Sequence, residues 1–111
     1  MSDKTTMLAK LLQLLDDNQA IDIKVIDVRQ QTTITDYMII SSGRSSRHVK
    51  AIAQKIMEEM KAIGFPALNY TGLESGDWVL IDFGDYVIHV MQPEARQYYN
   101  LEALWEEHPE N

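Results

Sequence analysis

A turn rich in serine and glycine, residues 41–46, is the first segment of the sequence whose residue types could do chemistry. It lies between a predicted strand and a predicted helix, where exposed backbone amides at the helix start can hold a phosphate group. The spacing is not that of a phosphate-binding P-loop, because no Lys-Ser or Lys-Thr pair follows the glycine. Magnesium-dependent nucleotidyl transfer would also need paired carboxylates, and no Asp-x-Asp or Asp-x-Glu sequence occurs. A helix cap explains the turn better. A nucleotide-binding or nucleotidyltransferase-like enzyme that uses residues 42–46 stays open as the alternative function.

The histidines are not spaced as metal ligands. His48, His89 and His108 fall at the start of a predicted helix, within a predicted strand and near the end of the sequence. The chain has no cysteine, no Gly-x-Ser-x-Gly sequence and no histidine beside an evident nucleophile. We therefore predict no catalytic residue, no metal and no cofactor. Alternation along its strand places His89 on the same sheet face as Val87 and Met91, which favours a hydrogen-bonded histidine over a site residue.

Aromatic side chains gather in the second half of the sequence. Both tryptophans, four of the five tyrosines and one of the two phenylalanines follow residue 69. Aromatic residues, methionine and arginine are enriched at protein–protein interfaces. Strand alternation places Trp78 and Asp82 on one sheet face and Phe83 on the other, so some of these rings must belong to the core. As a group, these residues predict a protein-binding face: Trp78, Asp82, Phe83, Tyr86, His89, Met91, Arg96, Tyr98, Tyr99 and Trp105.

The charge of the chain points to a basic partner. The 111 residues carry a formal net charge of −7. Residues 1–61 hold 9 basic and 8 acidic side chains, whereas residues 62–111 hold one basic residue, Arg96, and 9 acidic ones. The second half would repel a phosphate backbone, so free DNA or RNA is not predicted as the main ligand. A basic protein surface is the complementary partner, and a second copy of the chain, bound through the same apolar face as a homodimer, is the third candidate.

Length and composition indicate one globular domain that spans residues 1–111. No apolar run approaches the ~20 residues that a membrane span needs. Residues 1–10 lack the basic and then apolar pattern of a secretory signal. We therefore expect a cytoplasmic protein that has no membrane partner.

Periodicity and turn residues predict an α/β fold in which a mixed sheet of about five strands is flanked by helices. Helices are predicted at about residues 4–18, within an N-terminal helical segment 1–20, from Ser45 or Ser46 to Ile63, at 94–99 and at 101–107. Strands are predicted at 22–28, 37–41, 67–70, 78–83 and 86–91, the second of them central. Gly84-Asp85 predicts a type II′ hairpin turn, Asn100 a cap of the last helix, and residues 106–111 a frayed tail. The step from strand 37–41 to strand 67–70 predicts a right-handed crossover if those strands are parallel neighbours.

Several of these segments together resemble the Iojap-type ribosomal silencing factors, the RsfS family. The matching runs are residues 35–43, 45–49, 78–85, 89–91 and 96–105. The resemblance extends from about residue 22 to residue 105 in the family's order, and the presence of several motifs at once makes it specific. The sequence departs from the family at Thr71-Gly72, where Glu-Gly is common.

The resemblance implies a domain shaped like a nucleotidyltransferase but without its catalytic carboxylates, and therefore a protein that is not an enzyme. It implies a translational repressor that binds ribosomal protein fourteen of the large ribosomal subunit. Bound there, the factor would sterically block joining of the small subunit when nutrients are scarce, as in stationary phase. Trp78, Asp82 and Phe83 fall where the family contacts that protein. Further partner-binding positions implied by the motifs are Tyr37, His89, Met91, Arg96 and Tyr99.

Overall fold

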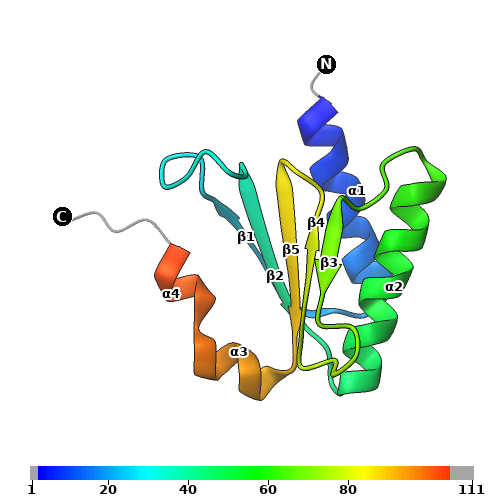
Figure 1. The fold of residues 1–111 in the computed structure, drawn as a ribbon, viewed down its shortest axis with the longest axis vertical. Coiled ribbons are helices and arrows are strands. Elements are labelled where there is room, and N and C mark those ends of the chain that lie inside the picture. The colour runs from blue at the N-terminus through cyan, green and yellow to red at the C-terminus, as the bar shows by residue number, and fades with distance from the viewer. Residues whose placement is uncertain (1–2, 106–111) are drawn as a thin grey trace.

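Two amphipathic helices cover one face of a five-stranded sheet in the computed structural model, which describes residues 3–105 (Figure 1). They are α1 (Asp3–Asp17) and α2 (Ser46–Ala62). Their apolar side chains recur at helical spacing. Fully buried leucines of α1, and isoleucines and a valine of α2, pack against the sheet. The layer between these helices and the sheet forms the larger of two buried clusters. The predicted N-terminal helix is confirmed, and it ends at Asp17.

Local sequence signals set both ends of α2. Ser45 Oγ accepts a hydrogen bond from the N–H of His48 at 3.1 Å, so Ser45 is the N-cap of the two serines that the sequence offered. At the other end Gly64 adopts a φ of 93°, and the N–H of Phe65 donates to the carbonyl of Met60 at 2.8 Å. This is a Schellman turn, in which a glycine takes the left-handed conformation that ends a helix.

The strands form one mixed sheet with the order β1-β2-β5-β4-β3. They are β1 (Ile21–Asp27), β2 (Tyr37–Ser42), β3 (Asn69–Thr71), β4 (Trp78–Asp82) and β5 (Tyr86–Met91). β2 pairs with β5 in parallel, and the three other pairings are antiparallel. As predicted, β2 is central: it lies between β1 and β5, and five of its six residues are buried. The α/β fold with a mixed five-stranded sheet is thereby confirmed.

The connection through α2 does not join neighbouring strands. β2 and β3 run in the same direction, but β5 and β4 lie between them. The parallel neighbour of β2 is β5, so the condition for the predicted crossover between strands 37–41 and 67–70 is not met. The physical reason is the tight turn before β5, which keeps β5 beside β4 and leaves the short, exposed β3 at the edge.

The hairpin of β4 and β5 has the two-residue turn that the sequence predicts. Gly84 takes a φ of 91°, as the first central position of a type II′ turn requires. The turn fixes the register, so that Trp78 lies opposite Met91. One step further out, Gln92 N–H donates to the carbonyl oxygen of Asp77 at 2.9 Å. The pairing of the two segments therefore continues past the ends of both strands.

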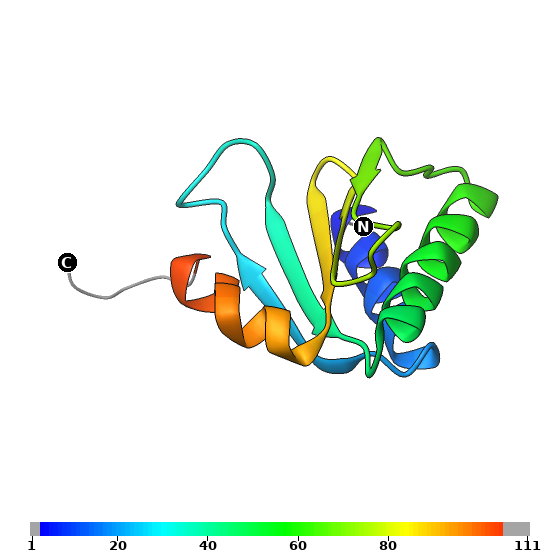
Figure 2. The same ribbon diagram turned by 60° about the horizontal axis from the view of Figure 1, so that its bottom comes forward.

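Two short helices lie on the other face of the sheet, away from α1 and α2 (Figure 2). α3 (Pro93–Tyr99) begins directly after β5, with the predicted proline in its first turn, and α4 (Leu101–Trp105) follows it. Leu101 joins a second buried cluster that Met91 and apolar residues of β1 and β2 also form. Trp78 and Trp105 pack against this cluster.

Asn100 separates the two short helices. It is the C-cap of α3, with a φ of 50° and its N–H donating to Arg96 O at 2.9 Å. It also directly precedes α4, and its predicted role as the cap of that helix stays a prediction. Asparagine tolerates this left-handed conformation better than most residues, which lets the chain turn between the helices. The last two residues of the predicted helix 101–107 and the predicted tail 106–111 lie outside the described residues.

Replacing Gly72 with alanine is expected to destabilise the fold strongly. Gly72 has a φ of 90°, and an added Cβ would lie 2.0 Å from the carbonyl oxygen of Trp78. We expect Gly72→Ala to lower the free energy of unfolding, measured in urea, by about 3 kcal/mol or more, because strain and a backbone clash act together. Gly64→Ala is the control: its φ is 93° but an added Cβ meets nothing within 4 Å, so a loss of about 1 kcal/mol is expected. Equal losses in the two variants would contradict the argument.

Candidate protein-binding site

An exposed aromatic cluster lies on the sheet face that carries α3. The Trp78 ring is centred 4.8 Å from the Tyr99 ring, and Tyr99 meets Tyr98 edge to face at 5.0 Å. Tyr98 is 80% exposed and Tyr99 is 53% exposed, whereas Trp78 is half-buried. Trp78, Tyr98 and Tyr99 are called the aromatic patch below. Large exposed rings of this kind are the side chains that most often anchor a protein partner.

His89 supports the aromatic patch from inside the sheet. The indole Nε1–H of Trp78 donates to His89 Nδ1 at 2.9 Å, which fixes the orientation of the tryptophan ring. His89 is only 4% exposed, and this burial lowers the pKa of its ring from 6.5 to about 4. The ring is therefore neutral near pH 7 and carries its own proton on Nε2. That nitrogen is buried without a hydrogen-bond partner among the residues that the structure describes.

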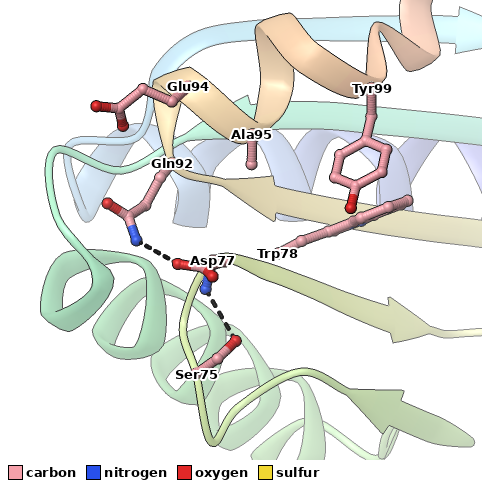
Figure 3. A pocket seen from close by; sticks show the side chains of 7 residues that line it. All are labelled: Ser75, Asp77, Trp78, Gln92, Glu94, Ala95 and Tyr99. Atoms are coloured by element: carbon pink, nitrogen blue, oxygen red, sulfur yellow. Dashed lines mark hydrogen bonds between the residues drawn. The ribbon is translucent and has the colours of Figure 1, made fainter.

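A pocket of about 310 Å³ opens beside the aromatic patch (Figure 3). It is lined by Ser75, Asp77, Trp78, Gln92, Glu94, Ala95 and Tyr99. Gln92 Nε2 donates to Asp77 Oδ1 at 2.8 Å, and the N–H of Asp77 donates to Ser75 Oγ at 3.2 Å. Together with the backbone bond from Gln92 to Asp77, these contacts tie the loop before β4 to the start of α3. The pocket therefore has a braced polar end and an aromatic end.

Met91 and Arg96, both predicted to bind a partner, hold the scaffold together. Met91 is fully buried in the second cluster, opposite Trp78. The Arg96 side chain is 13% exposed, and its Nε lies 2.9 Å from a carboxylate oxygen of Glu102. Its Nη1 donates to Ser42 Oγ at 3.1 Å and to a carbonyl of β1 at 3.3 Å. Arg96 therefore joins α3 to α4, β2 and β1. Both residues lie beneath the aromatic patch and hold the elements that carry it in place.

Asp82 and Phe83 lie at the far end of β4 from Trp78. Asp82 shares the face of Trp78, but its carboxylate accepts the N–H of Gly84 at 2.8 Å within the hairpin turn. Phe83 packs against the cluster under α1 and α2, on the opposite face. Four residues of a strand span roughly 13 Å at about 3.3 Å per residue. The three residues that the sequence groups together therefore do not form one compact contact point.

Tyr37 belongs to a separate aromatic pair. Its ring stacks on that of Tyr86 at 5.6 Å, with an angle of 13° between the planes. The guanidinium of Arg29 lies 5.3 Å from the centre of the Tyr37 ring. Because Tyr37 packs against the cluster of α1 and α2, it lies on the other face from the aromatic patch.

The serine-rich turn uses its polar groups within the fold. The N–H of Arg44 donates to His48 Nδ1 at 2.9 Å, and His48 Nε2 lies 3.0 Å from the carbonyl oxygen of Asn18. Ser45 caps α2, and a Cβ on Gly43 would meet Val49 at 2.9 Å. Within residues 3–105, no group of three or more acidic or histidine side chains could hold a metal ion. This geometry does not favour a nucleotide site at residues 42–46.

The structure brings together three of the predicted site residues, Trp78, His89 and Tyr99, above the buried Met91. The sequence analysis missed the polar end of the pocket, Asp77 and Gln92. A signal for it existed, because the two-residue hairpin turn fixes the register of both strands. Extending that register by one step places residue 77 opposite residue 92.

Comparisons with known proteins agree on one family. A sequence profile described as "Ribosomal silencing factor during starvation" matches residues 2–111. The ribosomal silencing factor RsfS of Zymomonas mobilis is 48% identical over 100 residues, which cover 89% of this chain and 75% of that protein. The Mus musculus protein named "Mitochondrial assembly of ribosomal large subunit protein 1" is 41% identical over 98 residues, 86% of this chain and 43% of its own length. A crystal structure of a protein from Chromobacterium violaceum matches with a TM-score of 0.87 and 38% identity over 95% of this chain and 89% of that one.

In the part of the chain that the structure describes, no helix is long and apolar enough to cross a bilayer.

The buried His89 is expected to make stability depend on pH. Its pKa is 6.5 when exposed and about 4 in the fold, so the stability that the neutral ring contributes above pH 6.5 is lost as the pH falls towards 4. We expect this residue to lower the free energy of unfolding by about 2 kcal/mol between neutral pH and pH 5. Urea unfolding at both pH values, followed by tryptophan fluorescence, measures the loss.

The matched control is His89→Asn, which keeps an acceptor near the position of Nδ1 but cannot titrate. Its stability should fall by clearly less than that of the original chain over the same pH interval. Identical pH dependence in the two proteins would show that His89 is not the titrating group.

Proposed function

The chain belongs to the family of ribosomal silencing factors, and from this premise we propose that it is a translational repressor that binds the large ribosomal subunit. The family description refers to silencing during starvation. The mouse relative is named for assembly of the ribosomal large subunit, which supports that subunit as the partner. In this proposal the chain binds ribosomal protein fourteen in the cytoplasm of a nutrient-limited cell and prevents the small subunit from joining.

The observation that carries the proposal is an exposed aromatic patch on the acidic half of the chain. Residues 62–111 carry 9 acidic side chains and one basic side chain, and that basic residue, Arg96, is engaged within the fold. Ribosomal proteins are mostly basic because they bind RNA, so opposite charges steer the two surfaces together. The exposed rings of Tyr98 and Tyr99, with Trp78 behind them, then supply the apolar contact that most of the affinity depends on.

The proposed site residues divide into contacts and supports. Trp78 and Tyr99 are the central contacts. Asp82 lies on the same sheet face as Trp78, towards the hairpin turn. Phe83 and Tyr37 pack on the opposite face, so a partner contact at these two residues would be separate from the aromatic patch. The remaining three proposed residues keep the contacts in place from below: His89, Met91 and Arg96.

Repression by this route needs no catalytic step. A folded domain bound where the small subunit must dock excludes that subunit by its volume alone, because overlapping atoms cannot be accommodated by close-packed protein interiors. The proposal therefore assigns no substrate, metal or cofactor to the chain. The degree of repression is set by the affinity of the chain for the large subunit and by the amount of the chain present.

Removal of the tryptophan ring is expected to weaken partner binding strongly. Trp78→Ala should weaken binding to large subunits, measured by co-sedimentation and by calorimetry with ribosomal protein fourteen, by a factor of about 100, as for a central aromatic anchor. Because Trp78 also packs on the second cluster, circular dichroism must show that the variant remains folded. Tyr98→Ala, which removes an exposed ring, provides a second test and should cost about tenfold.

The control is Tyr70→Ala on the edge strand β3. Its half-exposed ring lies opposite Ile81, a residue of the cluster under α1 and α2, and therefore on the other sheet face from Trp78. It should bind large subunits as tightly as the original chain. Unchanged binding by both Trp78→Ala and Tyr98→Ala would exclude the aromatic patch as the contact surface.

Subunit joining gives a test of function that does not depend on any one residue. Purified large and small subunits, mixed with excess chain at magnesium concentrations that normally permit joining, should stay separate in a sucrose gradient. The effect should weaken as salt is raised, because steering between opposite charges is screened over about 10 Å at 0.1 M salt. Full formation of joined ribosomes while the chain is bound to the large subunit would contradict the steric mechanism.

A further inference from the structure

The pocket beside the aromatic patch has the chemistry of a receptor for one basic side chain. We propose that it binds the side chain of an arginine presented by the protein partner. This inference rests on the proposed function, which it deepens by naming the group that the site recognises.

The polar end of the pocket presents acceptors. Asp77 accepts one hydrogen bond from Gln92 Nε2 at 2.8 Å, and this bond leaves the Gln92 side-chain oxygen as a further acceptor. Glu94 adds a second carboxylate in the first turn of α3. Among the described residues, those that line the pocket include no lysine or arginine. A cation that enters from outside therefore meets the Asp77 carboxylate without a competing positive charge in the wall. The Glu94 carboxylate, which points away from the rings in Figure 3, adds negative charge nearby.

Neighbouring basic residues do not occupy this pocket. Arg96 points its guanidinium to Glu102 and Ser42 instead. The Lys50 side chain packs beside Gly76 in the loop before β4, but it does not line the pocket. The polar end of the pocket can therefore accept a basic group from another molecule.

The other end of the pocket is aromatic. Figure 3 shows the rings of Trp78 and Tyr99 at one end and the Asp77–Gln92 pair at the other, with the small Ala95 between them. The two ring planes are inclined by 46°, so they form two walls of a corner. An arginine can lay its stem and the face of its guanidinium along these rings while its N–H groups reach the carboxylate.

These features favour arginine over other ligands. A lysine has a compact, strongly hydrated ammonium that neither stacks nor makes two parallel hydrogen bonds, whereas the guanidinium does both. Phosphates and nucleotides are repelled by the carboxylates. A volume of about 310 Å³ is at the lower limit for small-molecule sites, about 300 to 1,000 Å³, which suits one side chain.

The pocket is also rigid before any partner binds. Asp77 is held by two bonds to Gln92 and one to Ser75, and Trp78 is held by His89. Ordering these groups therefore costs little when an arginine enters, and such pre-organisation raises affinity.

The first experiment tests the pocket without the ribosome. N-acetyl-arginine amide is titrated into the full chain, and NMR follows the indole N–H of Trp78 and the side-chain amide of Gln92. Both signals should shift and saturate. The double variant Asp77→Asn/Glu94→Gln, which keeps the shape and removes both charges, should bind about tenfold more weakly.

Two controls make the titration specific. Glu74→Gln removes one charge from the same loop but outside the pocket, and it should leave the shifts unchanged. N-acetyl-lysine amide should bind several-fold more weakly than the arginine compound. Absence of saturable shifts, equal binding of the two compounds, or equal binding by the double variant would each overturn the assignment to arginine.

The second experiment connects the pocket to the partner. Binding of large subunits by Asp77→Asn/Glu94→Gln should fall by about tenfold relative to Glu74→Gln. If Trp78→Ala loses binding while the double variant keeps it, the arginine inference is overturned and the proposed function stands. If no form of the chain binds large subunits, the proposed function fails, and the titration alone decides whether the pocket selects arginine.

Discussion

The antiparallel pairing of β4 with β5 is the constraint on which the rest of the site depends. A two-residue turn with Gly84 at its first position fixes the register, and that register places Trp78 opposite Met91. The same pairing continues to Asp77 and Gln92, where the polar end of the pocket forms. Because α3 begins immediately after β5, its position is tied to the hairpin as well. A slip of one residue would move Trp78 to the opposite face and remove both the patch and the pocket.

The two faces of the sheet serve different purposes. One face is sealed by α1 and α2 over the larger buried cluster, which supplies most of the apolar burial that stabilises the fold. The other face carries only the short helices α3 and α4, which bury a smaller cluster. Short helices leave large rings such as Tyr98 and Tyr99 at the surface. A recognition surface can therefore form without weakening the main core, and the fold tolerates exposed aromatic groups there.

Residues that share a motif need not share a role. His89 and Met91 form their own matching run and Arg96 shares one with Tyr99, but all three lie beneath the aromatic patch. His89 orients the indole through one hydrogen bond, Met91 packs under it, and Arg96 joins α3 and α4 to the sheet. A contact surface of a few rings depends on such supports, since each ring gains affinity only if it is already held in its bound orientation. The matching runs therefore contain both the residues proposed to contact the partner and the residues that hold those contacts in position.

The sequence by itself determined the features that depend on neighbouring residues. Ser45 or Ser46 and Gly64 mark the ends of α2, and Gly84 marks the hairpin turn. Alternation along β4 separates Trp78 from Phe83. Caps, turns and strand faces are set within a few residues. The family resemblance also followed from runs of sequence. Only the tertiary structure decided that β5, and not β3, lies beside β2, that Asn100 ends α3, and that Asp77, Gln92 and Tyr99 enclose a pocket with Trp78. Those outcomes depend on which distant segments pack together, and the free energy of that packing belongs to the whole fold, not to any one segment.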